Sequence, residues 1–141
     1  MAKTSAILVR TSFVKIDEIV YKNIIDTLMQ NGWNIDNENG FSFMTNGSYE
    51  FEYAKGKDFN VVVDLIRHSI VDGKECFIKL VGDGSTSIEV TYLNPNSIMF
   101  SITDDVVNLK SIDLIDFSYY LERLSSIFDV IDLFRIECIY D

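Results

Sequence analysis

The chain has 141 residues, which is enough for one domain with a substantial core but too short for two. Apolar residues make up 48% and aromatic residues 13% of it, a composition typical of a globular protein rather than a disordered one. With 12 basic and 22 acidic residues the formal net charge is −10, which argues against binding to the phosphates of nucleic acids or to an anionic membrane.

The N-terminus and the two cysteines bear on the cellular compartment. The first apolar run stops at Arg10, so it is too short for the core of a signal peptide. No stretch reaches the roughly 18 apolar residues that a transmembrane helix needs. Cys76 and Cys138 are too far apart for a CxxC motif or a metal site. We interpret them as two small buried residues that stay reduced in the cytoplasm; the alternative is a single disulfide in a secreted protein.

The N-terminal part predicts a strand and a helix. Residues 5–13 read as a short strand, and residues 16–30 repeat apolar side chains with the 3.6-residue period of a helix. On this helix Glu18 stands four residues before Lys22, which is a favourable pair. Asn31-Gly32 then marks the helix end, because glycine adopts the left-handed conformation without steric cost.

A β-hairpin is predicted over residues 41–45 and 48–53. The intervening Asn46-Gly47 favours the positive φ angles of a type I′ turn, which joins two strands through a two-residue loop. The two strands are therefore expected to pair directly from this turn.

Residues 59–71 fit two structures. Consecutive valines favour a strand, whereas the apolar residues from Phe59 to Ile70 form one helical stripe. Asp58 could cap such a helix and Gly73 could end it. We prefer the helix because strict alternation fails within the segment.

Three further strands are predicted over residues 75–81, 86–93 and 97–103. Turn-forming residues separate them, so the three runs indicate an antiparallel meander. Alternation within the runs predicts one buried face and one partly polar face.

The C-terminal part predicts a helix and a final strand. Residues 114–129 contain a helical stripe that Asp113 or Asp116 could cap, and residues 133–140 alternate like a strand that returns to the sheet. The stripe consists of Phe117, Tyr120, Leu121, Leu124, Ile127 and Phe128. Together, the elements predict a single α+β domain over residues 1–141, with an antiparallel sheet of about five to seven strands and two or three helices packed on one face.

Little in the sequence points to catalysis. His68 is the only histidine, and on a helix Asp64, four residues before it, would hold it in a local surface pair. No spacing of histidine, cysteine and carboxylate residues suits zinc, and no phosphate or calcium loop occurs. Close carboxylate pairs are frequent, but 22 acidic residues produce such pairs by chance. We therefore expect no catalytic residue, no metal and no cofactor.

The negative charge grows along the chain. Residues 1–35 hold four basic and three acidic residues (net +1), residues 36–103 hold five and ten (−5), and residues 104–141 hold three and nine (−6). A field of one sign accelerates association with an oppositely charged partner, and aromatic anchors inside a charged rim are typical of tight interfaces. The simpler interpretation is that the charge serves solubility alone. As partner-binding residues we predict Asp104, Asp105, Asp129, Asp132, Tyr119 and Tyr140.

In size, acidic charge and lack of catalytic residues the chain resembles bacterial immunity proteins, which neutralise basic toxins. The resemblance implies a basic protein partner and slightly favours a monomer. The chain also resembles the acidic chaperones of type III secretion effectors, but that family usually ends on a helix, whereas residues 133–140 predict a final strand. We rank the immunity or inhibitor function first. A small enzyme or small-molecule binder with a carboxylate pair in a pocket is the third hypothesis.

Overall fold

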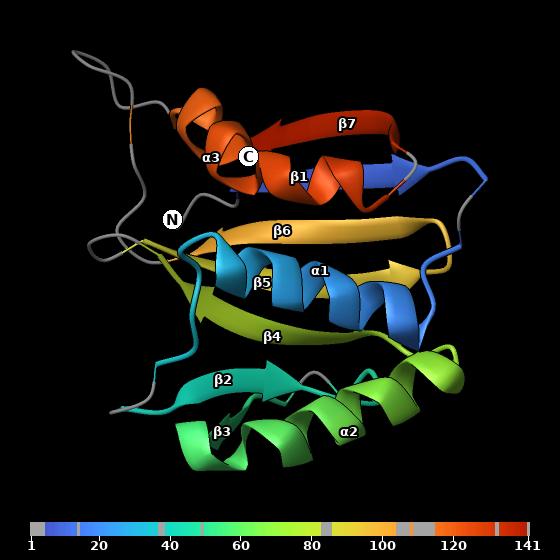
Figure 1. The fold of residues 1–141 in the computed structure, drawn as a ribbon, viewed down its shortest axis with the longest axis vertical. Helices are drawn as coiled ribbons and strands as arrows, with labels where there is room; N and C mark the ends of the chain where they lie inside the picture. The colour runs from blue at the N-terminus through green and yellow to red at the C-terminus, as the bar shows by residue number, and fades with distance from the viewer. Residues whose placement is uncertain are drawn as a thin grey trace.

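In the computed structural model, which describes residues 5–13, 15–36, 39–48, 50–82, 86–103, 108, 115–131 and 133–140, seven strands form one antiparallel sheet. Their order is β3-β2-β4-β5-β6-β1-β7 (Figure 1). In chain order the elements are β1 (Ser5–Thr11), α1 (Glu18–Gln30), β2 (Phe41–Met44), β3 (Glu52–Ala54), the 3-10 helix η1 (Gly56–Asp58), α2 (Phe59–Val71), β4 (Cys76–Val81), β5 (Ser87–Asn94), β6 (Ser97–Thr103), α3 (Phe117–Leu124), the 3-10 helix η2 (Ser125–Asp129) and β7 (Leu133–Tyr140).

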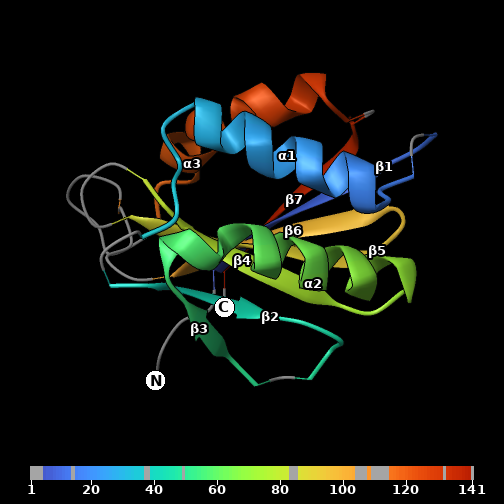
Figure 2. The same cartoon turned by 60° about the horizontal axis from the view of Figure 1, so that its bottom comes forward.

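The helices α1, α2 and α3 lie on one face of this sheet, as Figures 1 and 2 show. Strand residues that point toward them are apolar and fully buried, among them Ile7, Val90 and Phe100. They form one core with the inner sides of the helices. The predicted α+β class, with an antiparallel sheet and helices on one face, is therefore confirmed. None of the described helices is long and apolar enough to cross a membrane.

The first helix is fixed at its start, its end and its middle. The side chain of Asp17 accepts hydrogen bonds from the N–H groups of Ile19 (3.0 Å) and Val20 (2.8 Å), so the helix begins after an N-cap rather than at residue 16. Gly32 follows the helix with the positive φ of 98° that the sequence predicts. Between these ends, the buried Tyr21 hydroxyl donates a 2.6 Å hydrogen bond to the carbonyl oxygen of Val90, which ties α1 to β5.

The ion pair predicted on α1 between Glu18 and Lys22 does not form. Lys22 binds Asp26 at 2.7 Å instead of Glu18. Both carboxylates stand four residues from the lysine, one on each side, so the spacing rule alone could not choose between them. The choice leaves the half-buried Glu18 carboxylate without an ion pair among the described residues.

Residues 59–71 are helical, as preferred above, and form α2. Gly73 ends the helix with a φ of 71°, as predicted. The expected capping by Asp58 does not occur. Asp58 belongs to the 3-10 turn η1 and has a ψ of 6°, whereas a capping side chain requires an extended backbone.

The turn at Asn46-Gly47 forms, but the two-residue hairpin does not. Both residues have positive φ angles, 57° and 61°, and the N–H of Ser48 donates to Thr45. However, β2 and β3 pair only from Phe43 opposite Glu52, so the connection spans residues 45–51. The reason is that the turn docks elsewhere: the N–H of Asn46 donates to Ser69 Oγ of α2 (2.9 Å), and that of Gly47 donates to the carbonyl of Glu75 (2.8 Å).

The meander over β4, β5 and β6 is confirmed, with all neighbouring strands antiparallel. The last helix is shorter than predicted, because α3 tightens into the 3-10 helix η2 after Leu124. Asp116 caps α3 by accepting from the N–H of Tyr119, while the alternative cap, Asp113, lies outside the described residues. The fully buried stripe is Tyr120, Leu124 and Ile127, and Leu121 is only half-buried.

The two cysteines differ. Both thiols are free; Cys76 is fully buried in β4, but Cys138 is exposed on β7. The prediction that both are core residues is therefore wrong for Cys138. Its strand lies at the edge of the sheet, where alternation no longer implies burial.

Candidate protein-binding surface

Three of the six predicted binding residues, Asp104, Asp105 and Asp132, lie outside the described residues. The other three are Asp129, Tyr119 and Tyr140. Asp129 is exposed at the end of η2, and Tyr119 lies near the start of α3. Ten residues of helix separate them, about 17 Å at rises of about 1.5 Å per α-helical and 2.0 Å per 3-10 residue. The structure therefore does not gather Asp129 and Tyr119 into one small site.

The two predicted binding tyrosines, Tyr119 and Tyr140, make contacts within the protein. The guanidinium of Arg123 lies 3.5 Å from the centre of the Tyr119 ring, and Tyr120 meets the same ring edge-on at 5.2 Å between centroids. Tyr120 is fully buried, which excludes it as a surface anchor. Tyr119 and Tyr140 are half-buried and pack against the core. Among the described tyrosines Tyr53 on β3 is the exposed one, at 76%.

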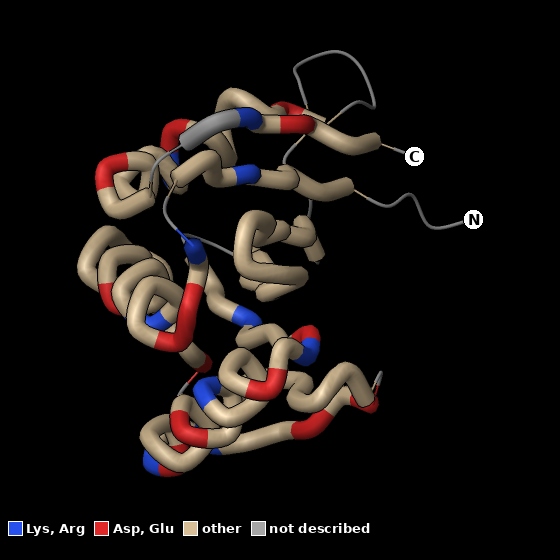
Figure 3. Tube along the Cα trace, turned by 90° about the vertical axis from the view of Figure 1, so that its right-hand side faces the viewer, with Lys and Arg blue, Asp and Glu red and all other residues tan. Residues whose placement is uncertain are grey.

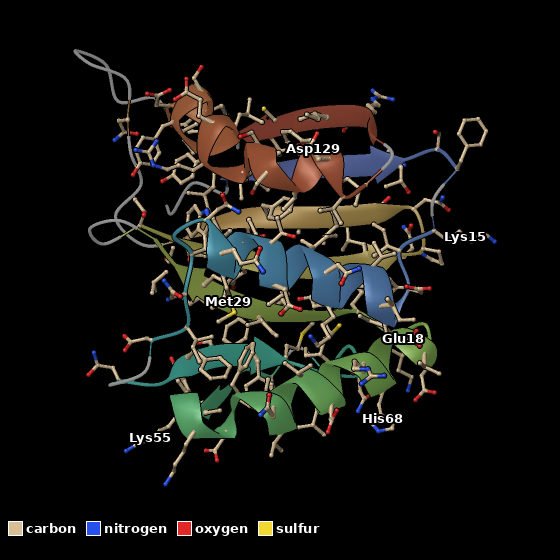
Figure 4. All side chains as sticks on the ribbon, viewed as in Figure 1. Lys15, Glu18, Met29, Lys55, His68 and Asp129 are labelled. Carbon is tan, nitrogen blue, oxygen red and sulfur yellow. The ribbon has the colours of Figure 1, made fainter. Side chains whose placement is uncertain are left out.

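The helical layer presents carboxylates that the sequence analysis did not combine. Glu18 in α1, Glu122 in α3 and Asp129 in η2 make no ion pair within the described part of the chain. The packing of α1 against η2 brings the first and last thirds of the sequence into the same layer. We call these three residues the helix-layer acidic surface. Figure 4 shows Glu18 and Asp129 on the two neighbouring helices of this layer, and Figure 3 shows acidic segments spread along the helical side.

The basic side chains within α1 and α3 are already occupied. Lys22 is paired with Asp26, and Arg123 both stacks on Tyr119 and donates to its carbonyl oxygen at 3.3 Å. Lys22 of α1 and Arg67 of α2 nevertheless border the same grooves as Glu18. The negative field is therefore strongest at Glu122 and Asp129, which make no ion pair within the described part of the chain.

The sequence analysis missed Glu18 for a simple reason. Residues 1–35 have a net charge of +1, because Lys3, Arg10 and Lys15 are counted together with the acids of α1. Arg10 lies at the end of β1, in the sheet, rather than on α1. A count along the helix alone, Glu18 to Gln30, would have shown two acids against one lysine.

His68 is an exposed residue of α2 (Figure 4). It borders a shallow groove with Glu18, Asp64, Arg67 and Val71. The ion pair of Asp64 is with Arg67, at 3.9 Å, rather than with His68 as expected. Both partners are largely exposed, so this pair contributes little to stability. Among the described residues, no three histidine, cysteine or carboxylate side chains come together as metal ligands.

Replacing His68 by alanine is expected to change neither stability nor partner binding. The imidazole is solvated, and exposed substitutions of this kind usually change the free energy of unfolding by less than about 0.5 kcal/mol. Urea unfolding and binding kinetics of His68→Ala measure both effects. A chemical activity that this substitution abolishes would instead identify His68 as a catalytic residue.

No family model, curated protein or solved structure matches this chain. A function for it has to be argued from the surface just described.

Proposed function

We propose that the protein is a non-catalytic binding module that neutralises a basic, toxin-like protein by stoichiometric binding, in the manner of an immunity or inhibitor protein. The observation that carries the proposal is the helix-layer acidic surface, whose carboxylates on α1, α3 and η2 make no ion pair with any of the described residues. Asp104, Asp105 and Asp132, which lie outside the described residues, stay predicted binding residues on the basis of their charge.

Charge of this kind acts on the rate of association. Oppositely charged surfaces steer two proteins together, and the acceleration falls as salt screens the field. At physiological ionic strength the Debye length is about 8 Å, so only carboxylates near the contact act strongly. The partner is therefore expected to approach the helical side rather than the open face of the sheet.

Two features favour this function over the alternatives. Tight inhibitors are rigid, and the helical layer is anchored to the sheet by buried contacts such as Tyr21 with Val90. The carboxylates of the proposed surface are exposed or half-buried rather than enclosed in the apolar pocket that a catalytic acid requires.

The proposal is tested by reversing charge on the proposed surface. Glu122→Lys combined with Asp129→Lys should slow association with a basic partner severalfold at low salt, and the difference should shrink toward 1 M salt. The first partner to test is the protein encoded next to this one, with binding kinetics recorded over a salt series. The matched control is Glu50→Lys with Glu52→Lys, two exposed acids at the β3 edge of the sheet, which changes the net charge by the same amount.

The control distinguishes steering by the helix-layer acidic surface from an effect of the net charge of the whole protein. Equal slowing by both double variants would mean that only the net charge matters, and the helix-layer surface would be abandoned. The double variant Asp104→Lys with Asp105→Lys, measured in the same way, tests whether these two acids belong to the interface. A basic partner that associates equally fast with all three variants would contradict the proposed function.

A further inference from the structure

The two edges of the sheet are very different. At one edge, β3 has only three residues, from Glu52 to Ala54. At the other, β7 runs over eight residues, from Leu133 to Tyr140, and pairs with β1 on its inner side only, within the described part of the chain. Figure 3 shows β7 along the margin of the molecule, next to the C-terminus. A long edge strand offers a row of N–H and C=O groups to another strand, and proteins usually shorten or cover such edges.

The side chains along β7 are partly apolar and accessible. Cys138 is exposed and Ile139 is 36% exposed. Ile136 is half-buried on the side that faces the helices. A strand added beside β7 would cover these side chains as well as satisfy the backbone groups of the edge.

The sequence of this strand is nearly symmetrical about Ile136. It reads Leu-Phe-Arg-Ile-Glu-Cys-Ile over residues 133–139, so a basic and an acidic residue flank the centre and apolar residues lie outside them. Arg135 and Glu137 point to the same face of the sheet, where their charged groups lie 2.9 Å apart. A second, antiparallel copy of β7 centred on Ile136 would place Arg135 opposite Glu137 of that copy, and Glu137 opposite its Arg135. Oppositely charged residues directly across a pair of strands stabilise the pair.

Other registers lose this complementarity. Moving the centre by one residue puts Arg135 opposite Arg135, or Glu137 opposite Glu137, and like charges in this position are destabilising. The net charge of −10 opposes self-association in general, but within β7 itself the charged residues are one arginine and one glutamate.

We propose that a second copy of this chain binds along β7, giving a two-fold dimer whose two sheets form one continuous antiparallel sheet centred on Ile136. The two-fold axis runs perpendicular to the sheet, so the helices of both copies lie on the same side. The helix-layer acidic surface lies on that side in both copies. The dimer is thus compatible with the proposed function but does not depend on it, and it replaces the slight preference for a monomer.

The first test is the mass of the full chain in solution over a range of concentrations. Analytical ultracentrifugation of the wild type should show a reversible dimer. Arg135→Glu should raise its dissociation constant by about tenfold or more, because four like charges then meet at the centre. Adding Glu137→Arg should restore dimerisation, since the exchanged charges are again complementary. The matched control Arg67→Glu, on α2, should leave the dimer unchanged.

The second test fixes the register. Directly opposite residues of antiparallel strands have Cα atoms about 4.5–5.5 Å apart, within the range of a disulfide. In a Cys138→Ser background, Ile136→Cys should therefore form a covalent dimer under mild oxidation, whereas Ile139→Cys should not, because Leu133 of the second copy stands opposite it.

Three results would overturn the proposal. One is a monomer at every concentration. Another is a dimer that is indifferent to Arg135→Glu and forms no Ile136→Cys cross-link. A third is a β7 edge that takes up a strand of the basic partner while the free protein stays monomeric. Since binding of a basic protein is measured separately, failure of the dimer leaves the proposed function standing, and the converse also holds.

Discussion

Leu124→Ala is expected to lower the free energy of unfolding by about 2–5 kcal/mol, the usual cost of removing a large side chain from a closed core. Leu124 is 1% exposed and belongs to the buried stripe of α3 and η2 together with Tyr120 and Ile127. Leu121→Ala should cost much less, about 1 kcal/mol, because Leu121 is half-buried and water already reaches its side chain.

Urea unfolding followed by the fluorescence of Trp33 measures both variants. Trp33 is buried, and its indole N–H donates to the carbonyl oxygen of Arg123, so it reports directly on the docking of α3. The two leucines are matched in size and lie three positions apart on one helix. Equal losses of stability would contradict the assignment of the buried face.

The helix boundary explains why the sequence identified this face only in part. A period of 3.6 residues places Phe117, Leu121, Leu124 and Phe128 on one stripe. After Leu124 the chain has three residues per turn, which places Ile127 directly above Leu124 and rotates Phe128 away from it, so that Phe128 is half-buried. The spacing of apolar residues does not predict this transition from an α-helix to a 3-10 helix, because the transition arises from the packing of the helix against the sheet.

Elements with strong periodicity could be predicted from the sequence. The order of the strands in the sheet and the contacts between elements could not. The α1 and α2 stripes and the meander follow from repeats of 3.6 and two residues. The strand order does not follow, since nothing in residues 133–140 says that they pair with β1 at an edge. Exposure of Cys138 and the accessibility of β7 are consequences of that order.

The candidate surface was predictable to a similar degree. Asp129 was expected and is exposed, because an acid near the end of a helix is seldom buried. Glu18 was missed, since its place in the helical layer depends on how α1 packs, and since Lys22 had two carboxylates at equal spacing to choose from. Tyr119 was expected to be available but is held by Arg123, a contact within one turn of α3 that the sequence spacing of four residues would have suggested.

Alkaline pH is expected to destabilise the protein strongly, beginning near pH 9. Burial in β4 raises the pKa of the Cys76 thiol from its ordinary value of 9.0 to about 12. The thiol also points its hydrogen toward the carbonyl oxygen of Ile66, at 3.9 Å, an interaction that a thiolate would lose. Burial likewise raises the pKa of Tyr21 well above 10.0, with the nearby Cys76 as a second cause.

The direction in which stability changes with pH follows from which state of the protein, folded or unfolded, keeps the Cys76 proton. Between pH 9 and about 12 the unfolded chain has released the Cys76 proton while the folded chain retains it, so stability falls as pH rises. One such proton corresponds to about 1.4 kcal/mol per pH unit, which amounts to about 4 kcal/mol over the whole interval. Above pH 10 the unfolded chain also ionises at Tyr21, and the slope becomes steeper.

Urea unfolding at a series of pH values from 8 to 11 provides the measurement, with Cys76→Ala and Cys138→Ala as the variants. Cys76→Ala should lose the decline between pH 9 and 10, where Tyr21 does not yet contribute, even though the smaller side chain lowers stability at every pH. Cys138→Ala should retain most of the wild-type slope, because the Cys138 thiol is exposed on β7 and its pKa is raised without the enclosure that surrounds Cys76. Complete burial between α2 and the sheet should prevent the Cys76 thiol from ionising in the folded protein. Equal slopes for the wild type and Cys76→Ala below pH 10 would contradict this, because they would mean that the thiol ionises as readily in the folded protein as in the unfolded chain.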